Sequence, residues 1–423
     1  MANNSRENQI PGYLYALDGL RAVSLILIVM FHTWQQSWIG YQWKPSWMNH
    51  YLFNLDILQR CGYVAIDSFF VLSGFCLFYP IARDMFGESK FGGWKNFFIK
   101  RARRIYPSYL FMLLIMLFIP KLSYGCNMRS FSDVLKHYLT HILFIHTWDA
   151  KTLGSTISTA WTMGIECQFY VVFPLLCIPF RKKPVITFAG MAFFSLGLRL
   201  VLLSYADISA MVIQAITPAY FDVFGFGMLA AYFVVYARNN ARALMDKLKL
   251  FMTLISALCL FLAVCYMYWI SRVCFPNGFN GDVYFRFLYR GFFAALIAGF
   301  IFTACFSHSI WEKKIWGNKL WIFLSSISYT VYLWHQNIYI FLKSTNLMGA
   351  VTERPMDDRP AMWRMVFICI ICSVIIGWFV TKYIEAPISK YGYKGCGYKI
   401  LEAFKLKKIS SASQSRSPQK KKK

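Results

Sequence analysis

The residues with the clearest potential for chemistry lie in the first apolar segment, LDGLRAVSLILIVMFHTW. Arg21 and His32 are eleven residues apart, which is about three helical turns, so they share one face and lie roughly 16 Å apart along the axis. Ionisable groups inside a membrane segment are costly and usually face a cavity or a partner. Imidazole is well suited to accept a hydroxyl proton, so His32 is a candidate general base. Alternatively, both side chains snorkel to opposite membrane interfaces.

A second candidate site is the basic sequence NFFIKRARRIYPSYL. Arg101 and Arg104 stand at positions i and i+3, so on a helix their guanidinium groups point the same way. Two planar guanidinium groups at the mouth of a membrane helix suit a phosphate or pyrophosphate. The same cluster is also typical of an ordinary cytoplasmic topology signal, and the spacing alone leaves both interpretations open.

Two carboxylates fall inside apolar stretches. Glu166 is the acid of STAWTMGIECQFYVVFPLL, with Tyr170 four residues further on, and Asp67 lies in GYVAIDSFFVLSGFCLF. An acid at such depth is functional or ion-paired. We expect Glu166 to contact His32 or an arginine, with a purely structural salt bridge as the alternative. Gly74 in the second stretch would let a neighbouring backbone approach closely.

The segment LSSISYTVYLWHQNIYIF carries a polar stripe. Ser328, Tyr332 and His335 stand at i, i+4 and i+7, on one helical face. This stripe would line a sugar or acyl pocket, or simply hydrogen-bond between helices, and the pattern does not distinguish the two.

A metal site is the remaining chemical possibility. His137 and His141 stand at i and i+4, and His146 follows, which is possible ligand geometry. The chain has no HExxH motif and no second cluster of comparable strength. We therefore expect no metal.

The composition indicates what kind of scaffold positions these residues. The 423 residues are 57% hydrophobic and only 15% charged, and the mean hydropathy is +0.43. Soluble domains average about 25% charged residues, so the chain belongs to the membrane class. A net charge of +26 would suit nucleic acid. Its Lys and Arg residues, however, lie in short clusters between apolar runs, as in cytoplasmic loops, so we expect no nucleic-acid partner.

The apolar runs predict an all-α bundle of about ten transmembrane helices. A shorter run at 134–148 contains three histidines and predicts an interfacial or re-entrant helix. With both termini cytoplasmic, ten spans place the basic clusters inside, whereas eleven would place the cluster at 181–183 outside. The expected spans are 17–36, 61–81, 105–121, 164–180, 184–204, 211–236, 250–271, 290–307, 320–343 and 363–384.

The expected domain organisation is simple. Residues 1–12 form a cytoplasmic segment, 13–390 the membrane domain and 391–423 a basic, disordered cytoplasmic tail. The tail lysines would be solvated or attracted to anionic lipid. The first apolar run has no small-residue cleavage site, so we expect it to remain as a membrane helix.

The order of these motifs resembles that of the acyltransferase family 3 membrane proteins, which include bacterial O-antigen and other cell-envelope O-acetyltransferases. The resemblance covers roughly residues 13–390. The matching blocks are LDGLRA with Arg21 and His32, FFVLSGF at 69–75, F-x3-R-x2-R-I-x-P at 97–107, W-x4-E-x2-FY at 161–170, ISYTVYLWH at 327–335 and YIEAPIS at 383–389.

The resemblance implies transfer of an acyl group, usually acetyl from acetyl-CoA, to a hydroxyl of a carbohydrate or lipid-linked glycan in the bacterial plasma membrane. The family's functional residues carry over to Arg21, His32, Arg101 and Arg104. Glu166 falls in the family's glutamate block. Two positions depart from the pattern: Cys167 stands where a second acid or small residue is common, and Gln336-Asn337 replaces Trp-Pro after the histidine.

The expected mechanism divides the work between two ends of the bundle. Arg101 and Arg104 would hold the donor phosphates at the cytoplasmic face, assisted by Arg21. His32 would act as general base or carry the acyl group transiently, oriented by Glu166. The residues expected to line the pocket are Asp67, Tyr170, Tyr332 and His335.

Two other functions compete with this interpretation. A transporter or glycolipid flippase would use the same buried charges to bind and move its substrate. A different type of membrane acyltransferase would be built around an intramembrane histidine with an asparagine or aspartate, and the paired-arginine block argues against it.

Overall fold

The computed structural model describes residues 13–37, 39–43, 47, 50, 52–123, 130–204, 215–274, 283–344 and 359–392. The expected N-terminal segment 1–12 and the tail beyond residue 392 lie outside the described residues.

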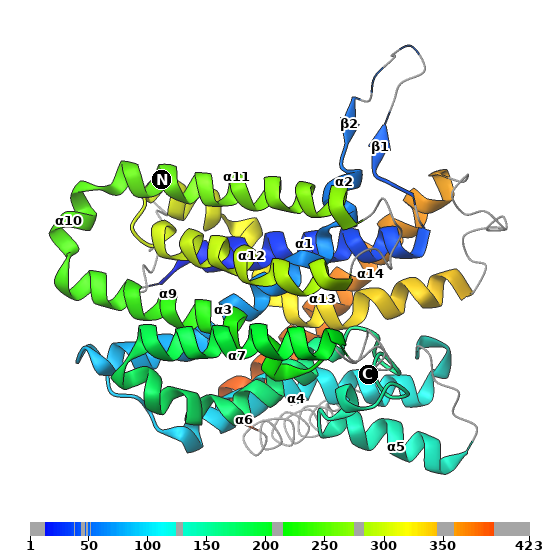
Figure 1. Ribbon diagram of the computed structural model, residues 1–423. Coiled ribbons are helices and arrows are strands. Elements are labelled where there is room, and N and C mark those ends of the chain that lie inside the picture. Colours follow the sequence, from blue (N-terminus) through cyan, green and yellow to red (C-terminus); the bar gives the residue numbers. More distant parts are fainter. Residues whose placement is uncertain are drawn as a thin grey trace, which may run out of the picture.

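Long helices form at each of the apolar runs predicted to span the membrane. Most of them lie side by side along a shared direction (Figure 1). Within the described ranges they are α1 (Tyr15–Ser37), α3 (Ala65–Met85), α4 (Trp94–Phe118), α6 (Trp161–Lys182), α7 (Pro184–Ser204), α9 (Phe221–Asn240), α11 (Lys249–Cys274), α12 (Val283–Ala304), α13 (Lys319–Ser344) and α14 (Arg359–Val380).

Seven segments of the described chain are long and apolar enough to cross a membrane. They comprise α1, α6, α7 and α11, together with α3, α9 and α14 extended by adjoining short segments, and α12 contributes a shorter apolar stretch, Tyr289–Ala304. Neither α4 nor α13 qualifies: α4 carries three arginines in its first half, and α13 carries the polar stripe. The structure therefore supports an all-α integral membrane protein, with seven candidate spans against the ten predicted.

A small hairpin is the one feature that hydropathy does not predict. Strands β1 (Gln42–Trp43) and β2 (Phe53–Asn54) pair antiparallel. The hairpin projects sideways from the bundle near one end of its helices, and α10 (Arg242–Lys247) joins α9 to α11 at the opposite end (Figure 1). The other short elements are α2 (Asp56–Arg60), η1 (Gly62–Val64), η2 (Pro120–Leu122), η4 (Thr217–Tyr220), η5 (Ile310–Trp316) and η7 (Thr381–Glu385).

The predicted short run at 134–148 forms α5 (Phe131–Ile142) and η3 (His146–Trp148). A Ser130–Asp133 capping box starts α5. The loop that follows η3 folds into the bundle, where Thr156 and Thr159 are fully buried. The Asn337 side-chain amide donates to the Thr156 carbonyl oxygen at 2.8 Å, which fixes this loop against α13.

Helices α3 and α9 pack through their backbones. A Cβ atom at Gly74 would overlap the carbonyl oxygen of Phe224, and one at Gly227 would overlap that of Val71. Only glycine fits at these two positions, as expected where membrane helices approach closely. The close-packing role expected for Gly74 is thus confirmed.

Candidate active site

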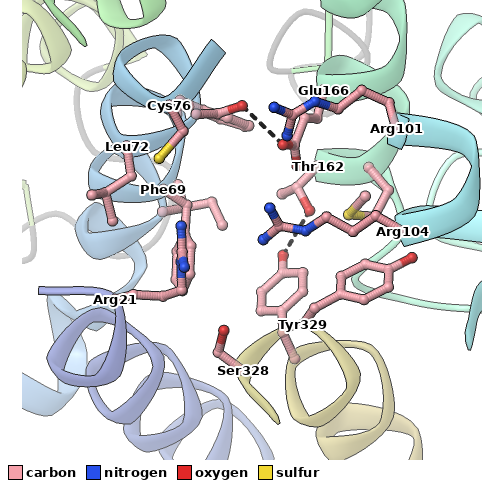
Figure 2. Close-up of a pocket in the computed structure, with 15 residues that line it drawn as sticks. Arg21, Phe69, Leu72, Cys76, Arg101, Arg104, Thr162, Glu166, Ser328 and Tyr329 are labelled. Atoms are coloured by element: carbon pink, nitrogen blue, oxygen red, sulfur yellow. Dashed lines mark hydrogen bonds between the residues drawn. The ribbon is translucent and has the colours of Figure 1, made fainter. Parts of the chain in front are cut away.

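A cavity of about 80 Å³ lies between five helices in the interior of the bundle. Its wall brings together α1, α3, α4, α6 and α13, which are far apart in the sequence (Figure 2). The residues lining it are Arg21, Ile66, Phe69, Phe70, Leu72, Ser73, Cys76, Arg101, Arg104, Thr162, Met163, Glu166, Ser328, Tyr329 and Tyr332.

Three arginines expected to bind the donor line this one cavity. Arg101 and Arg104 extend from α4 on one side, and Arg21 extends from α1 on the opposite side (Figure 2). The i, i+3 spacing places the two α4 side chains on one face, as the sequence predicts. With Glu166 as the only carboxylate in the lining, the cavity carries a formal charge of +2, which suits an anionic ligand.

Neighbouring side chains hold each arginine in place. The Arg101 guanidinium lies 5.7 Å from the Phe97 ring centroid and 5.6 Å from that of Tyr170. Arg21 lies 3.5 Å from the Ser325 hydroxyl, and that hydroxyl donates to Asp18 at 2.6 Å. Aromatic faces stabilise a guanidinium without neutralising it.

A further carboxylate lies behind Arg104. Glu385 of η7 accepts hydrogen bonds from Ser108 at 3.3 Å and from Thr330 at 3.4 Å, and it interacts electrostatically with Arg104. Glu385 lies within the YIEAPIS block but was not predicted as a site residue. An acidic side chain flanked by apolar residues is the signal that could have identified it.

The Glu166 carboxylate is held by two hydroxyl groups. Ser73 of α3 donates to it at 2.9 Å, and the Tyr170 hydroxyl, one turn further along α6, donates to the same oxygen. The two hydroxyl groups fix the position of this carboxylate oxygen. Tyr170 therefore acts on the cavity through Glu166, although its ring lies outside the lining.

His32 is paired with the other predicted histidine. His32 Nδ1 lies 2.7 Å from His335 Nε2, and His335 Nδ1 lies 3.1 Å from the carbonyl oxygen of Val331. A carbonyl oxygen can only accept, so His335 carries its proton on Nδ1 and offers a bare Nε2. His32 must then donate from Nδ1, which leaves its own Nε2 as a free proton acceptor.

This pairing changes the expected arrangement of the mechanism. Glu166 was expected to orient His32, but Ser73 and Tyr170 are the hydrogen-bond partners of Glu166, and the partner of His32 is His335. The reason is geometric, because α13 lies directly against α1 and the acid faces α3.

Tyr332 separates the histidine pair from the arginine cavity. Its ring lines the cavity and lies 5.8 Å from the His335 ring, centroid to centroid. The Tyr332 hydroxyl is 2.9 Å from Thr162 Oγ1, which holds the ring against α6. Neither histidine is among the residues lining the cavity, so the two predicted ends of the site are adjacent but distinct.

Asp67 was expected to line the pocket, but it is not among the residues that line the cavity. Its carboxylate is fully buried and forms a 2.5 Å ion pair with Arg290 of α12. A second buried ion pair, Arg199 with Asp222, lies close enough to influence Asp67 electrostatically. Neither arginine was predicted to take part in a buried pair. Each is a charge inside an apolar run, which indicates that it has a polar or ionic partner within the protein.

Of the three histidines after α4, two share hydrogen bonds with Ser155 and the third stacks on one of them. Ser155 Oγ lies 2.8 Å from His137 Nδ1 and 3.4 Å from His141 Nε2, and it donates to the Thr152 carbonyl. The His141 and His146 rings stack at 4.1 Å. Among the described residues, no group of three or more His, Cys, Asp or Glu side chains has the geometry to hold a metal ion.

Comparison with known proteins gives a consistent result. The peptidoglycan O-acetyltransferase OatA of Listeria monocytogenes is 25% identical over 403 residues, covering 90% of this chain and 56% of that protein. Two relatives are each 23% identical: "Putative O-acetyltransferase SACOL0978" of Staphylococcus aureus, over 92% of this chain and 59% of the relative, and "Putative peptidoglycan O-acetyltransferase YrhL" of Bacillus subtilis, over 90% and 56%. The chain thus spans less than two thirds of the length of these relatives. No solved structure gives a significant match.

The family comparison covers most of the membrane domain. The family described as "Acyltransferase domain" matches residues 14–383. This range runs from the start of α1 to η7 and so contains the arginine cavity and the histidine pair. The resemblance inferred from the motifs is confirmed, and the chain belongs to the family 3 membrane acyltransferases.

Proposed function

We propose that this protein transfers an acyl group, most simply acetyl, from acyl-CoA to a hydroxyl of a cell-envelope carbohydrate such as peptidoglycan or O-antigen. The observation that carries this proposal is the free Nε2 of His32, oriented through His335 and adjacent to a cavity with three arginines. A base next to an anion-binding site is what acyl transfer from a phosphorylated donor requires.

The arginines form the donor end of the site. Arg101 and Arg104 bind the phosphates of CoA, and Arg21 contributes positive charge from the facing helix. Guanidinium groups suit this role because their planar forks match phosphate oxygens. Glu166 keeps the cavity from binding anions too tightly and fixes Tyr170 beside Arg101.

The histidine pair forms the acceptor end. The acceptor hydroxyl oxygen attacks the thioester carbonyl carbon while His32 Nε2 takes the hydroxyl proton. The carbon–sulfur bond then breaks, and His32 returns the proton to the departing CoA thiolate. His335 is a positioning residue in this scheme. The thioester reaches His32 past Tyr332, whose ring stands between the two ends.

The proposed setting is a bacterial plasma membrane, with both termini cytoplasmic and ten spans. In addition to the seven apolar segments, α4, α12 and α13 cross the bilayer, with Arg101, Arg290 and His335 each held by partners inside the protein. Ten crossings place both termini on one side, and the positive-inside rule makes that side cytoplasmic. Residues 13–390 form the acyltransferase domain, flanked by the terminal segment 1–12 and the basic tail 391–423.

The test is acyl transfer by the purified chain in proteoliposomes with labelled acetyl-CoA and a glycan acceptor. Wild-type protein should acylate the glycan, and His32→Ala should not. Mass spectrometry of surface glycan from deletion and complemented strains identifies the acceptor. Full acylation by His32→Ala at normal protein levels would contradict the proposed role of His32, and glycan movement that needs no CoA and no acyl transfer would favour transport.

A further inference from the structure

A second cavity of about 730 Å³ lies next to the arginine cavity, and Arg101 lines both. It is a groove between α4, α6, η4 and the turn before η3. Most of its wall is apolar. The lining residues are Phe98, Arg101, Ala102, Ile105, Tyr106, Leu143, Phe144, Ile145, Trp148, Cys167, Gln168, Tyr170, Val171, Val172, Ile216, Thr217, Pro218 and Phe221.

The rim of this groove is apolar and exposed. Val171 of α6 is 68% exposed, and Leu143 and Trp148 on the facing segment are similarly exposed. On a membrane helix such side chains contact lipid rather than water. An apolar groove open to the bilayer is filled by chains, since an empty one would forfeit the contacts of its lining.

The amide group in the groove has all its partners within the protein. Gln168 Oε1 accepts from the Thr217 hydroxyl at 2.6 Å, and Gln168 Nε2 donates to the Phe144 carbonyl at 2.8 Å. Trp148 Nε1 also donates to Gln168, at 3.3 Å. These polar atoms therefore do not call for a ligand.

Arg101 is different. Its guanidinium lies over the rings of Phe97 and Tyr170, and it forms no ion pair within the described part of the chain. A guanidinium in a membrane segment requires an anionic or polar partner. The groove thus combines an apolar body with one cation, which is the complement of a chain that ends in an anionic headgroup.

We infer that the groove binds one acyl chain of an anionic phospholipid, with the lipid phosphate at Arg101. This site shares Arg101 with the reaction proposed above, because that side chain lines both cavities, so a lipid phosphate and the donor phosphates would compete for it. Tyr170 connects the two, because its ring walls the groove while its hydroxyl holds Glu166 in the arginine cavity. A bound lipid would therefore pack against the residue that positions Glu166.

The test uses the full chain in nanodiscs containing phosphatidylglycerol with a diazirine on one acyl chain. Photolysis should label peptides of α6 and η4 that line the groove. Val171→Trp fills the groove and should reduce this labelling about tenfold, the scale expected for losing a well-formed site. Leu175→Trp is the matched control, since Leu175 lies one turn further along α6, is 66% exposed and is not in the lining.

The headgroup is tested separately. Wild-type protein should label more strongly with phosphatidylglycerol than with phosphatidylcholine carrying the same diazirine chain. Arg101→Gln should remove that preference while labelling by the chain remains. Labelling that Val171→Trp leaves unchanged, or that does not distinguish the two lipids, would overturn the inference. Displacement of the label by palmitoyl-CoA but not by CoA would overturn it too, by assigning the groove to the acyl chain of the donor. Because labelling needs no turnover, these results are independent of whether the protein acylates glycan.

Discussion

His32 Nδ1 and His335 Nε2 lie 2.7 Å apart, although the two residues are 303 positions apart in the sequence. The Val331 carbonyl fixes the proton on the far side of His335. Together they fix the tautomer of His32, the proposed base, a task that a carboxylate performs in Ser-His-Asp enzymes. A neutral partner does so without placing a buried negative charge beside the base.

The first prediction concerns His335. His335→Leu removes the acceptor for His32 Nδ1–H and should lower kcat about 100-fold, within the range for misplacing a general base. His335→Gln offers an amide oxygen in its place and should recover part of that loss. The measurement is the pH profile of kcat for both variants. His308→Gln, in the exposed connection after α12, is the control. An unchanged profile for His335→Leu would show that His335 only packs.

A second prediction distinguishes the roles of Arg101 and Arg104 from that of Arg103, which lies between them on α4. Arg101→Gln and Arg104→Gln should each raise the KM for acyl-CoA by roughly 10-fold or more, because each removes a charge-assisted bond to phosphate. The effect should diminish at high salt. Arg103→Gln removes the same charge from a side chain outside the cavity lining and should leave KM near wild type. Equal effects at all three positions would indicate a general surface potential instead.

The buried ion pair of Asp67 and Arg290 should matter for stability. Asp67→Leu leaves Arg290 charged and unpaired, which costs about 3–5 kcal/mol in comparable buried pairs. The double variant Asp67→Leu/Arg290→Met should recover much of that loss. Thermal unfolding of the detergent-solubilised protein measures both. If the double variant were no more stable than the single one, the pair would not be the source of the effect.

The histidine cluster predicts a pH dependence of stability. Burial lowers the pKa of His146 to about 4, below its ordinary value of 6.5. The folded state therefore keeps this imidazole neutral while the unfolded chain takes up a proton below pH 6.5. The free energy of unfolding therefore falls as the pH drops from 6.5 towards 4, by about 3 kcal/mol in total.

The apparent unfolding temperature between pH 8 and pH 4 is the measurement. It should fall with acidification in the wild type and fall less in His146→Gln, which keeps a donor for the Ala160 carbonyl oxygen that His146 Nε2 contacts at 3.0 Å. Burial also lowers the pKa of His141, which stacks on His146, so part of the dependence should persist. A wild-type slope in His146→Gln would assign the effect to other groups.

Much of the scaffold follows from the sequence because membrane helices are local structures. Each apolar run had to satisfy its own backbone hydrogen bonds, so helices were predictable one at a time. The hairpin at 42–54 was not, since two-residue strands leave no periodic pattern. Because α4 and α13 carry polar and charged residues, length and hydropathy alone do not identify them as membrane spans, although both form long helices.

The site was predictable where it depended on one helix and not where it depended on two. Arg101 and Arg104 share a face because of their spacing alone. The partner of His32 depends on how α1 meets α13, and the pairing of Asp67 depends on α3 meeting α12; periodicity within one segment contains neither. The same limit explains why Arg199 and Arg290 went unrecognised.

The close backbone contacts of Gly74 with Phe224 and of Gly227 with Val71 also bear on how substrates enter and leave. Two helices whose backbones touch cannot slide or rotate past each other without collision, so α3 and α9 should move as one rigid unit. Ser73, which donates to Glu166, belongs to this unit. A conformational change that admits a donor or releases a product must then occur where α1 and α13, or α4 and α6, face α3 and α9. His32 on α1 and the arginines on α4 would then move relative to Ser73, which is fixed on α3.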